Sequence, residues 1–425
     1  MKRSCNFILA LCFASLQVGA QVNRTDSNGF ALVAIHSVGP QFELQTGTNS
    51  IPAGIVNRFI FGGFIKNESI DNFESNMPSS LRGGAAMRFE ISNKGQFLWT
   101  GKSVWKHPRV SVFHEQNAGF RMNDDAFRLI FQGNGAYLGQ TLNAKIDQAR
   151  RFSTYGLNLQ WAKRISSGGS PNWKQMWWSI SPTILKGYSE INAFTASVLT
   201  DSLAQNIDVD WGGNIRTATL KNGIAGWGML AGFGYRSTLS SPTFKSWSIE
   251  LKDFGAFKMN SLKDYSRMSP PGAGSINIST SFATLTEIFG GEWFKGRRDS
   301  LIDQMEIDSS SASKWVLSPF QIKLGLEFKK FIVSLDWRNL PGYIPSLKMQ
   351  GVMKPIAKSS AFKWAPGLTL GGFDTWNIDL HTGLDLKPRL KGGFSANASV
   401  LGIESLAFPG KQHGLGVRAG VLFSF

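Results

Sequence analysis

The chain has 425 residues, of which 45 are Lys or Arg and 29 are Asp or Glu, so its formal net charge at pH 7 is +16. Aromatic residues make up 12% of it, yet its mean hydropathy is slightly negative. Beyond the N-terminus, Gly, Ser, Asn or charged residues interrupt every apolar run before it reaches the roughly 20 residues that a membrane helix needs. This composition excludes a helical membrane protein and suits a barrel with apolar residues at every second position.

The first 20 residues predict a secretory signal peptide. Lys2 and Arg3 precede an apolar stretch, and small residues come before a cleavage site at Gln21. Both cysteines, Cys5 and Cys12, lie in this segment, so we expect a mature protein without thiol, disulfide or cysteine metal site.

Cleavage leaves 43 basic against 29 acidic residues, a formal charge of +14. The surplus favours contact with phosphate-rich outer-membrane lipid and lipopolysaccharide. An acidic glycan or an anionic solute is the alternative. Nucleic acid is not expected as a partner of an exported chain.

Residues 21–105 carry mixed short patterns interrupted by Gly62-Gly63 and Gly83-Gly84. Three interpretations stay open for this region. It forms a plug inside a barrel, a periplasmic cap, or extra strands that raise the strand count to sixteen. The favoured architecture has a plug-like N-terminal region.

Residues 106–425 predict an all-β, transmembrane antiparallel barrel in the outer membrane of a Gram-negative bacterium. Alternation with a period of two recurs between short breaks, which is the pattern of barrel strands. The count is about fourteen, in a range of 12 to 16, and an even number places both ends in the periplasm. We expect the strands at 108–116, 152–163, 176–187, 190–200, 206–218, 224–236, 244–256, 319–329, 331–339, 345–353, 362–373, 376–387, 392–403 and the terminal segment that ends at 425.

Polar side chains on the alternate faces of these strands are the expected lining of a lumen. Opposite charges there would pair across the interior and narrow any passage. The Asp379 and His381 pair also permits a general base, as in a barrel hydrolase, but lumen lining is the favoured interpretation. The lumen-facing candidates are Lys323, Glu327, Asp336, Arg338, Asp379, His381, Asp385 and Arg418.

The stretch 257–318 breaks the strand rhythm and predicts one long insertion with a helix at about 281–305. Strand parity places it outside the cell. Its aromatic and basic residues suggest either a lid on the barrel rim or a docking surface for another envelope protein or lipopolysaccharide. The docking candidates are Phe289, Trp293, Phe294, Arg297 and Arg298.

The last strand combines a uniform apolar face with a small or polar one. Val417, Val421 and Phe423 are predicted to face lipid, whereas Arg418 faces the lumen. A strand of this kind that ends on Phe425 resembles the signal by which outer-membrane barrels reach the barrel assembly machinery, which is therefore an expected partner.

Several segments resemble an uncharacterised Bacteroidota outer-membrane barrel family, the domain of unknown function 5723. They are the runs 127–134 (FRLIFQGN), 139–142 (GQTL), 62–65 (GGFI) and 185–187 (LKG). The resemblance implies FadL-type barrels and barrels associated with type IX secretion as distant relatives. The chain lacks the Asn-Pro-Ala motif that commonly opens the plug of those relatives, which disfavours FadL-like transport.

The sequence favours a non-enzymatic barrel in surface-protein secretion, anchoring or envelope assembly. The first alternative is a FadL-like channel for a hydrophobic or anionic small solute, and the second is a barrel hydrolase. The five histidines show no metal-ligand spacing, so we expect no metal, no cofactor and no catalytic residues.

Overall fold

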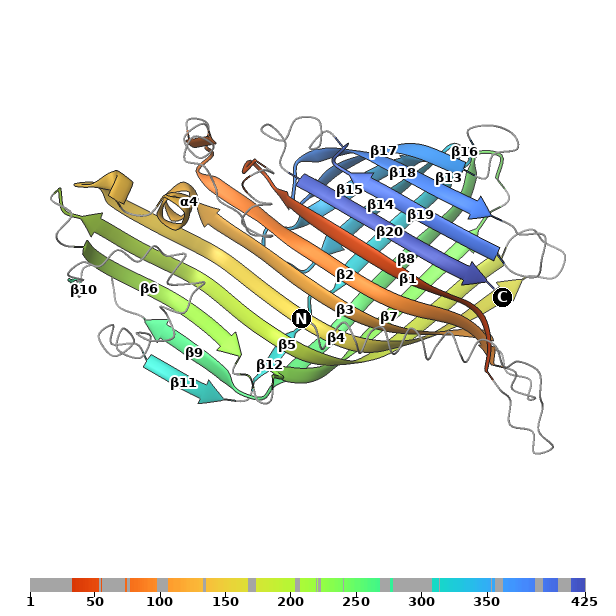
Figure 1. Cartoon of the computed structure of the whole chain (residues 1–425), viewed down its shortest axis with the longest axis horizontal. Helices are drawn as coiled ribbons and strands as arrows, with labels where there is room; N and C mark the ends of the chain where they lie inside the picture. The colour runs from red at the N-terminus through yellow and green to blue at the C-terminus, as the bar shows by residue number, and fades with distance from the viewer. Residues whose placement is uncertain are drawn as a thin grey trace.

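The computed structural model describes residues 33–52, 55, 73–74, 77–97, 106–132, 135–166, 173–202, 207–218, 220, 223–239, 241–267, 276–277, 308–312, 314–352, 354–355, 362–386, 393–403 and 414–424. Within them, fourteen strands form a closed antiparallel β-barrel (Figure 1). In ring order these are β1 (Val33–Thr48), β2 (Ser80–Phe97), β3 (Lys106–Asn123), β4 (Thr141–Ser166), β5 (Trp173–Thr200), β7 (Gly226–Thr238), β8 (Phe244–Met259), β13 (Gln321–Phe328), β14 (Phe331–Arg338), β15 (Ile344–Gly351), β17 (Phe362–Gly372), β18 (Trp376–Leu386), β19 (Gly393–Leu401) and β20 (Gly414–Ser424). No helix among the described residues is long and apolar enough to cross a membrane.

The first and last strands close the ring. β1 pairs with β20 from Gly47 opposite Gly414 to Ser37 opposite Ser424. Hence β1 begins and β20 finishes at the same end of the barrel, which we call the terminal end, and the opposite one is the far end. The short strand β12 (Trp315–Leu317) pairs with β8 ahead of β13, and β16 (Lys354–Pro355) pairs with β17 beside β15.

The sheet branches at β5. The first part of β5 pairs with β7, up to Leu185 opposite Gly226, and its second part pairs with β6 (Ile207–Ala218) from Ser189 opposite Thr217 onward. Beyond β6 lie β9 (Leu262–Arg267), β10 (Ile276–Asn277) and β11 (Asp308–Ala312). We call these four strands the wing, which projects at the lower left of Figure 1.

The two halves of the barrel differ in strand length. The long wall, β2 to β5, has strands of 18, 18, 26 and 28 residues. The short wall, β13 to β20, has strands of 8 to 11 residues apart from the two-residue β16, which is about what a membrane crossing requires. The long wall therefore extends past the short wall at the far end (Figure 1).

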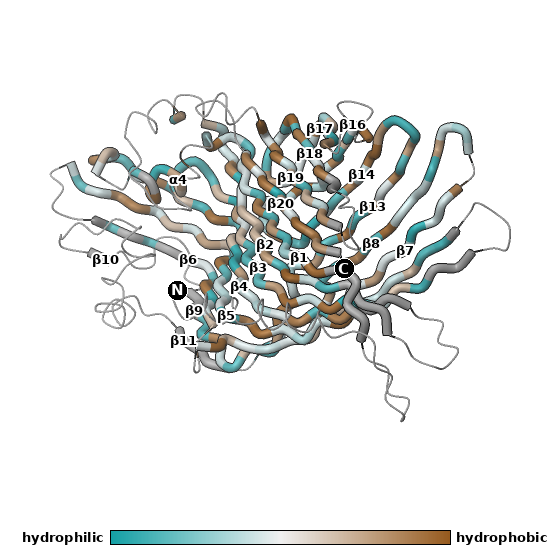
Figure 2. The backbone as a smooth tube through the Cα atoms, turned by 45° about the vertical axis from the view of Figure 1, so that its right-hand side comes forward, coloured by the Kyte–Doolittle hydropathy of each residue, from teal (hydrophilic) through white to brown (hydrophobic). Residues whose placement is uncertain are grey.

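The outward face of the barrel is apolar and is bordered by aromatic pairs. On β7, residues 227, 229, 231 and 233 are exposed while the residues between them are buried or half-buried. Near the terminal end Trp161 stacks on Trp178 at 4.3 Å between ring centroids, and near the far end Trp227 contacts Trp315 at 6.3 Å. Such a band between two aromatic girdles is the exterior of a barrel in a bilayer. Figure 2 shows the same alternation along the strands.

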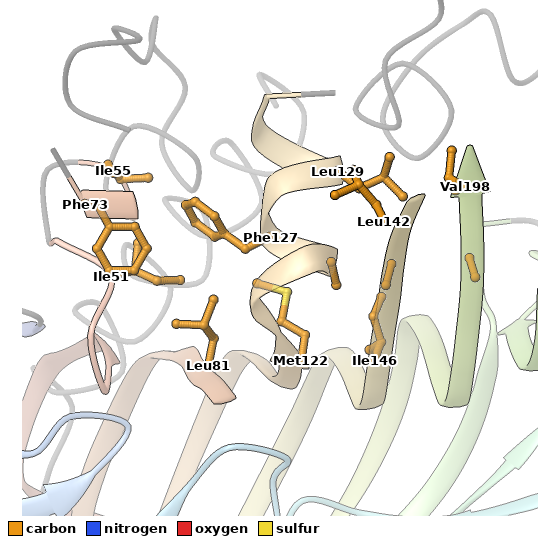
Figure 3. Close-up of a cluster of buried hydrophobic side chains, with 13 residues drawn as sticks. Ile51, Ile55, Phe73, Leu81, Met122, Phe127, Leu129, Leu142, Ile146 and Val198 are labelled. Carbon is orange, nitrogen blue, oxygen red and sulfur yellow. The ribbon is translucent and has the colours of Figure 1, made fainter. Parts of the chain in front are cut away.

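A hydrophobic cluster covers the long wall where it passes the far end (Figure 3). Helix α4 (Asp124–Phe131) starts at Asn123, whose side chain accepts a hydrogen bond from the Ala126 amide, and it buries Phe127 completely. Leu81 lies beneath it, on the opposite face of β2 from the lumen-facing Arg82. Outward apolar residues that leave the membrane would otherwise meet water, so the helix shields them.

Several sequence-based expectations need correction. In region 21–105, residues 33–48 and 80–97 form β1 and β2 of the wall, so of the three interpretations the extra strands are confirmed there and the plug or cap is wrong for these residues, while the count does not rise to sixteen. The predicted strands 176–187 and 190–200 are one strand, β5, while 206–218 is a strand of the wing. Two strands were thus counted in excess and two were missed, so the total of fourteen holds.

The insertion 257–318 is also more regular than expected. It contains β9, β10, β11 and β12, all of which pair within the wing or with β8. The helix predicted at about 281–305 lies outside the described residues.

Candidate functional site

An arginine cluster spans the lumen beside the long wall. Arg88 on β2 makes ion pairs with Glu115 of β3 (Nη1–Oε2, 2.9 Å) and Asp253 of β8 (Nη1–Oδ2, 3.0 Å). Its Nε lies 3.1 Å from Glu90, and its guanidinium lies 4.2 Å from the Phe113 ring centroid. Because β3, β4, β5 and β7 separate β2 from β8 in the ring, the Arg88–Asp253 pair bridges two distant parts of the wall.

Asp253 reaches Arg88 through an irregularity in β8. Its backbone φ is +57°, a left-handed value that is rare for residues other than glycine. The pairing of β7 with β8 shifts register at this point, between Ala231 and Phe233. The bulge thus aims a carboxylate into the lumen.

Two tight turns of the short wall fold inward and fill the far half of the lumen. Leu340 and Tyr343 of the β14–β15 turn and Phe373 of the β17–β18 turn are buried together with Ala86 of β2. Their carbonyl groups are held by Arg82 of β2, which donates to Gly342 O (3.3 Å) and Gly372 O (3.1 Å).

Two glycines of the long wall make room for these turns. A Cβ atom at Gly84 would overlap the Phe373 ring, and one at Gly119 would overlap the Pro341 carbonyl oxygen. Larger residues at either position would push the turns out of the lumen. The closed lumen therefore depends on glycines in one wall and aromatic turns in the other.

Toward the terminal end, a cavity of ≈ 130 Å³ remains in the lumen. It brings together five of the predicted lumen residues, namely Lys323, Asp336, Asp379, His381 and Arg418. Glu43 of β1 and Lys348 of β15 complete its charged lining. The sequence analysis missed Glu43 because β1 lay in the region left open between plug and strands.

Ion pairs cross this cavity as well. Glu43 Oε1 lies 2.9 Å from Arg418 Nη2 on the neighbouring β20 and 3.3 Å from Arg338 Nη2 on β14. Lys348 Nζ lies 3.4 Å from Asp336 Oδ2. The Glu43–Arg338 contact is the second bridge between separated strands, since β15 to β20 lie between β14 and β1.

The remaining predicted lumen residues have separate placements. Glu327 makes an ion pair with Arg236 and accepts a hydrogen bond from Ser246 (2.9 Å). Asp385 belongs to β18, but its side chain lies outside the described residues.

The structure also brings together a histidine and a serine that the sequence did not predict to be neighbours. His381 Nδ1 lies 2.8 Å from Ser399 Oγ of β19, the distance of a base from a serine nucleophile. Asp379 Oδ2 accepts a hydrogen bond from Thr369 (2.6 Å). The cavity is also smaller than the 300–1,000 Å³ or so of typical ligand pockets. Lumen packing is the simpler account of this pair.

The predicted targeting strand is placed by its register with β19. Phe423 is 44% exposed, and its ring centroid lies 5.4 Å from that of Phe394. Val417 and Val421 alternate with Arg418 and so share the face of Phe423. Phe425 and the docking candidates Phe289, Trp293, Phe294, Arg297 and Arg298 lie outside the described residues.

No family model and no curated protein sequence matches the chain. The resemblance to the Bacteroidota barrel family therefore has no matching model behind it. Solved barrels of low sequence identity are similar to the chain, and three of them serve as examples. The translocator domain of the autotransporter NalP from Neisseria meningitidis is 9% identical, covers 100% of this chain and 97% of its own, and has a TM-score of 0.33.

The other two are the toluene transporter TbuX from Ralstonia pickettii, 8% identical over 91% of this chain and 88% of its own (TM-score 0.40), and a FadL homologue from Pseudomonas aeruginosa, 9% identical over 92% and 89% (TM-score 0.36). These are likenesses of barrel architecture. They assign no transport or secretion role to this chain.

Proposed function

We propose that the chain is a non-enzymatic outer-membrane barrel with a closed lumen, which acts through its far end as a docking platform in surface-protein secretion, anchoring or envelope assembly. The apolar exterior between two aromatic girdles supports the membrane location. Lipid, lipopolysaccharide and the barrel assembly machinery are its general partners in this proposal.

The closure of the lumen is the observation that carries the proposal. Arg88 and Asp253 bridge β2 and β8 at 3.0 Å, and Glu43 and Arg338 bridge β1 and β14 at 3.3 Å. Between these pairs and the inward turns, the lumen retains a cavity of ≈ 130 Å³ lined by charged side chains. A water-filled channel would need those bridges to open.

The far end supplies the surface that the proposal needs. The long wall continues beyond the short wall, and the cluster around Phe127 keeps this extension folded in water. With both termini in the periplasm, the far end, the wing and the insertion 257–318 lie outside the cell. An epitope tag at Ser310 should then be detected on intact cells, and detection only after permeabilisation would remove the platform from the cell surface.

A paired experiment tests the two halves of the proposal. Purified protein in planar bilayers should give no steady porin-like current, whereas such a current contradicts a closed lumen. A photo-crosslinking amino acid at Leu138, which is 40% exposed at the far end, should capture an envelope protein in cells. Leu239, 44% exposed in the β7–β8 hairpin at the terminal end, is the matched control. Equal capture at both positions, or at neither, contradicts docking through the far end.

The FadL-like alternative predicts a different structure and outcome. It needs an apolar passage that connects the lumen to an opening in the wall. The lumen cavity has Ile332, Met349, Leu401 and Val417 in its lining, but charged residues such as Glu43, Lys323 and Arg418 lie among them, which does not suit a hydrocarbon. Uptake of a small hydrocarbon by proteoliposomes in the absence of current would favour this alternative over a platform.

A further inference from the structure

A second cavity, of ≈ 360 Å³, opens where the sheet branches at β5. It is lined by Arg151 and Ser153 of β4, Lys186 and Ser189 of β5, and Thr217 of β6. Arg151 faces Ser189, which in turn faces Thr217, so these side chains share one face of three adjacent strands. That face is the outward one, because the intervening Phe152 is buried with Leu185 on the lumen side.

The branch in the sheet also determines the direction of the Lys186 side chain. Ser153 pairs with Gly187 and Thr154 with Leu185, which leaves Lys186 as the extra residue of a bulge. Its ammonium group lies 6.0 Å from the ring centroid of Tyr155. A bulge commonly directs a side chain out of the regular ladder, and here it turns Lys186 toward the cavity.

The basic residues of this cavity differ from the neighbouring Arg150 in their ion pairing. Arg150 points to the other face and makes an ion pair with Glu190 at 2.6 Å. Arg151 and Lys186 are both exposed, and neither makes an ion pair with a carboxylate in the part of the chain that the structure describes. Two cations and three hydroxyl groups, with no acidic residue in the lining, form a donor set for an anion with several oxygen atoms.

The position of the cavity relative to the membrane indicates which class of anion it can bind. Tyr155 faces Ile184, which faces Trp227, and this row includes the far-end aromatic girdle. Arg151, Ser153 and Lys186 are the next outward residues toward the far end. Basic residues directly beyond an aromatic girdle lie at the level of lipid headgroups.

We propose that Arg151, Lys186 and the hydroxyl groups around them bind a phosphate group of an outer-leaflet lipid. The inference rests on the proposed outer-membrane location and adds a ligand class to the barrel exterior. It does not depend on the docking platform, so a barrel without a docking partner would still bind the lipid, and a failed platform would leave this site intact.

Native mass spectrometry of the full chain in an uncharged detergent tests the site. The probes are phosphorylated lipid A and the same lipid after enzymatic removal of its phosphates. Wild type should bind the phosphorylated form roughly 25-fold more tightly, because each of the two basic residues near an anionic headgroup contributes about a factor of five. The variant R151Q/K186Q should lose this preference, and R151K/K186R should retain most of it.

The matched control is K145Q/K174Q, which removes the same charge from β4 and β5. Lys145 is already paired with Asp147 at 3.0 Å, and Lys174 lies near the terminal end. Gel heat-modifiability verifies that every variant is folded. Equal binding of both lipids by wild type, or an unchanged preference in R151Q/K186Q, overturns the proposal. Complete displacement of the lipid by inorganic phosphate also overturns it, because the site would then recognise free phosphate.

Discussion

The long wall and the short wall bury their apolar surface beyond the membrane in different ways. The short wall stops at the membrane boundary, and its turns fold into the lumen, where Tyr343 and Phe373 pack edge to face at 4.9 Å. The long wall continues outward and must cover its own apolar face, which α4 does by burying Phe127. Strand length thus decides whether apolar surface is hidden inside the barrel or beneath a helix outside it.

The difference also separates stability from closure. The inward turns and the bridges from Arg88 and Arg338 occupy the lumen, whereas the cluster over the long wall includes Leu81, on the opposite face of β2. A change on one side should therefore leave the other intact. The following variants test whether the lumen contacts and the cluster over the long wall are independent of each other.

The largest effect is expected for Phe127→Ala in the cluster over the long wall. Its ring is fully buried and lies 5.1 Å from that of Phe73. Its removal should weaken the docking of α4 by about 3–5 kcal/mol. Hydrogen exchange should show α4 losing protection while the short wall keeps it. Leu138→Ala, at a 40% exposed position nearby, is the control, and equal loss in both variants contradicts the packing argument.

The second largest loss of stability is expected for Val421→Arg, on the outward face of β20 in the short wall. An arginine on the lipid face near the bilayer centre costs roughly 2–4 kcal/mol. Reversible folding into lipid vesicles measures this cost, with Val421→Ile as the control for side-chain shape. If the arginine folds as well as the isoleucine, the face assigned to Val421 is wrong.

A smaller loss of stability is expected for Asp253→Asn, which weakens the bridge between β2 and β8. Loss of a hydrogen-bonded charge partner should destabilise the barrel by roughly 1.5–3 kcal/mol, since Arg88 keeps Glu90 and Glu115. Denaturant unfolding in detergent provides the measurement. Asp147→Asn, which breaks an exposed pair with Lys145, should cost only about 0–1 kcal/mol. Indistinguishable midpoints would show that the bridge contributes no more to stability than an exposed ion pair.

The smallest effect concerns pH at the far end. The Gln132 side chain donates to Glu74 Oε2 at 2.9 Å and, together with Tyr137 and Arg128, it holds the pKa of Glu74 below its usual value despite partial burial. A lowered folded pKa gives stability that is present above the usual value of 4.5 and is lost as pH falls through the folded value. Wild type should protect the α4 amides from exchange better than Glu74→Gln near neutral pH, and the difference should vanish in stronger acid. A difference that persists there excludes Glu74 as the titrating group.

Alternation in the sequence was sufficient to predict the strands of the short wall. There most outward residues are large and apolar, as in Leu324 and Leu326, and most inward ones are polar or small, so the period of two is strong. In β1 the same period is present, but Gln45 and Thr46 are both buried and polar, which makes the pattern weak. The region 21–105 was left open for this reason.

Pairing partners were beyond the reach of a local pattern. The segment 206–218 is a strand as predicted, yet nothing in its alternation says that it pairs with the outer half of β5 instead of joining the wall. The lumen bridge between Arg88 and Asp253 joins residues 165 positions apart and needs a left-handed residue in β8. Of the charged lumen residues, the sequence identified several on the strands of the short wall, such as Asp336 and Arg418. It missed Lys348 on the same wall, and on the other strands it missed Glu43, Arg88, Glu90, Glu115 and Asp253.

The branch at β5 makes the wing a separable module. The chain leaves the wall twice, after β5 and after β8, and the two excursions pair with each other through β6 and β9. The strand pairs of the fourteen-strand ring, β5 with β7 and β8 with β13, do not involve the strands of the wing. The barrel is accordingly a scaffold with a replaceable part, into which an unrelated folded domain can be grafted for display.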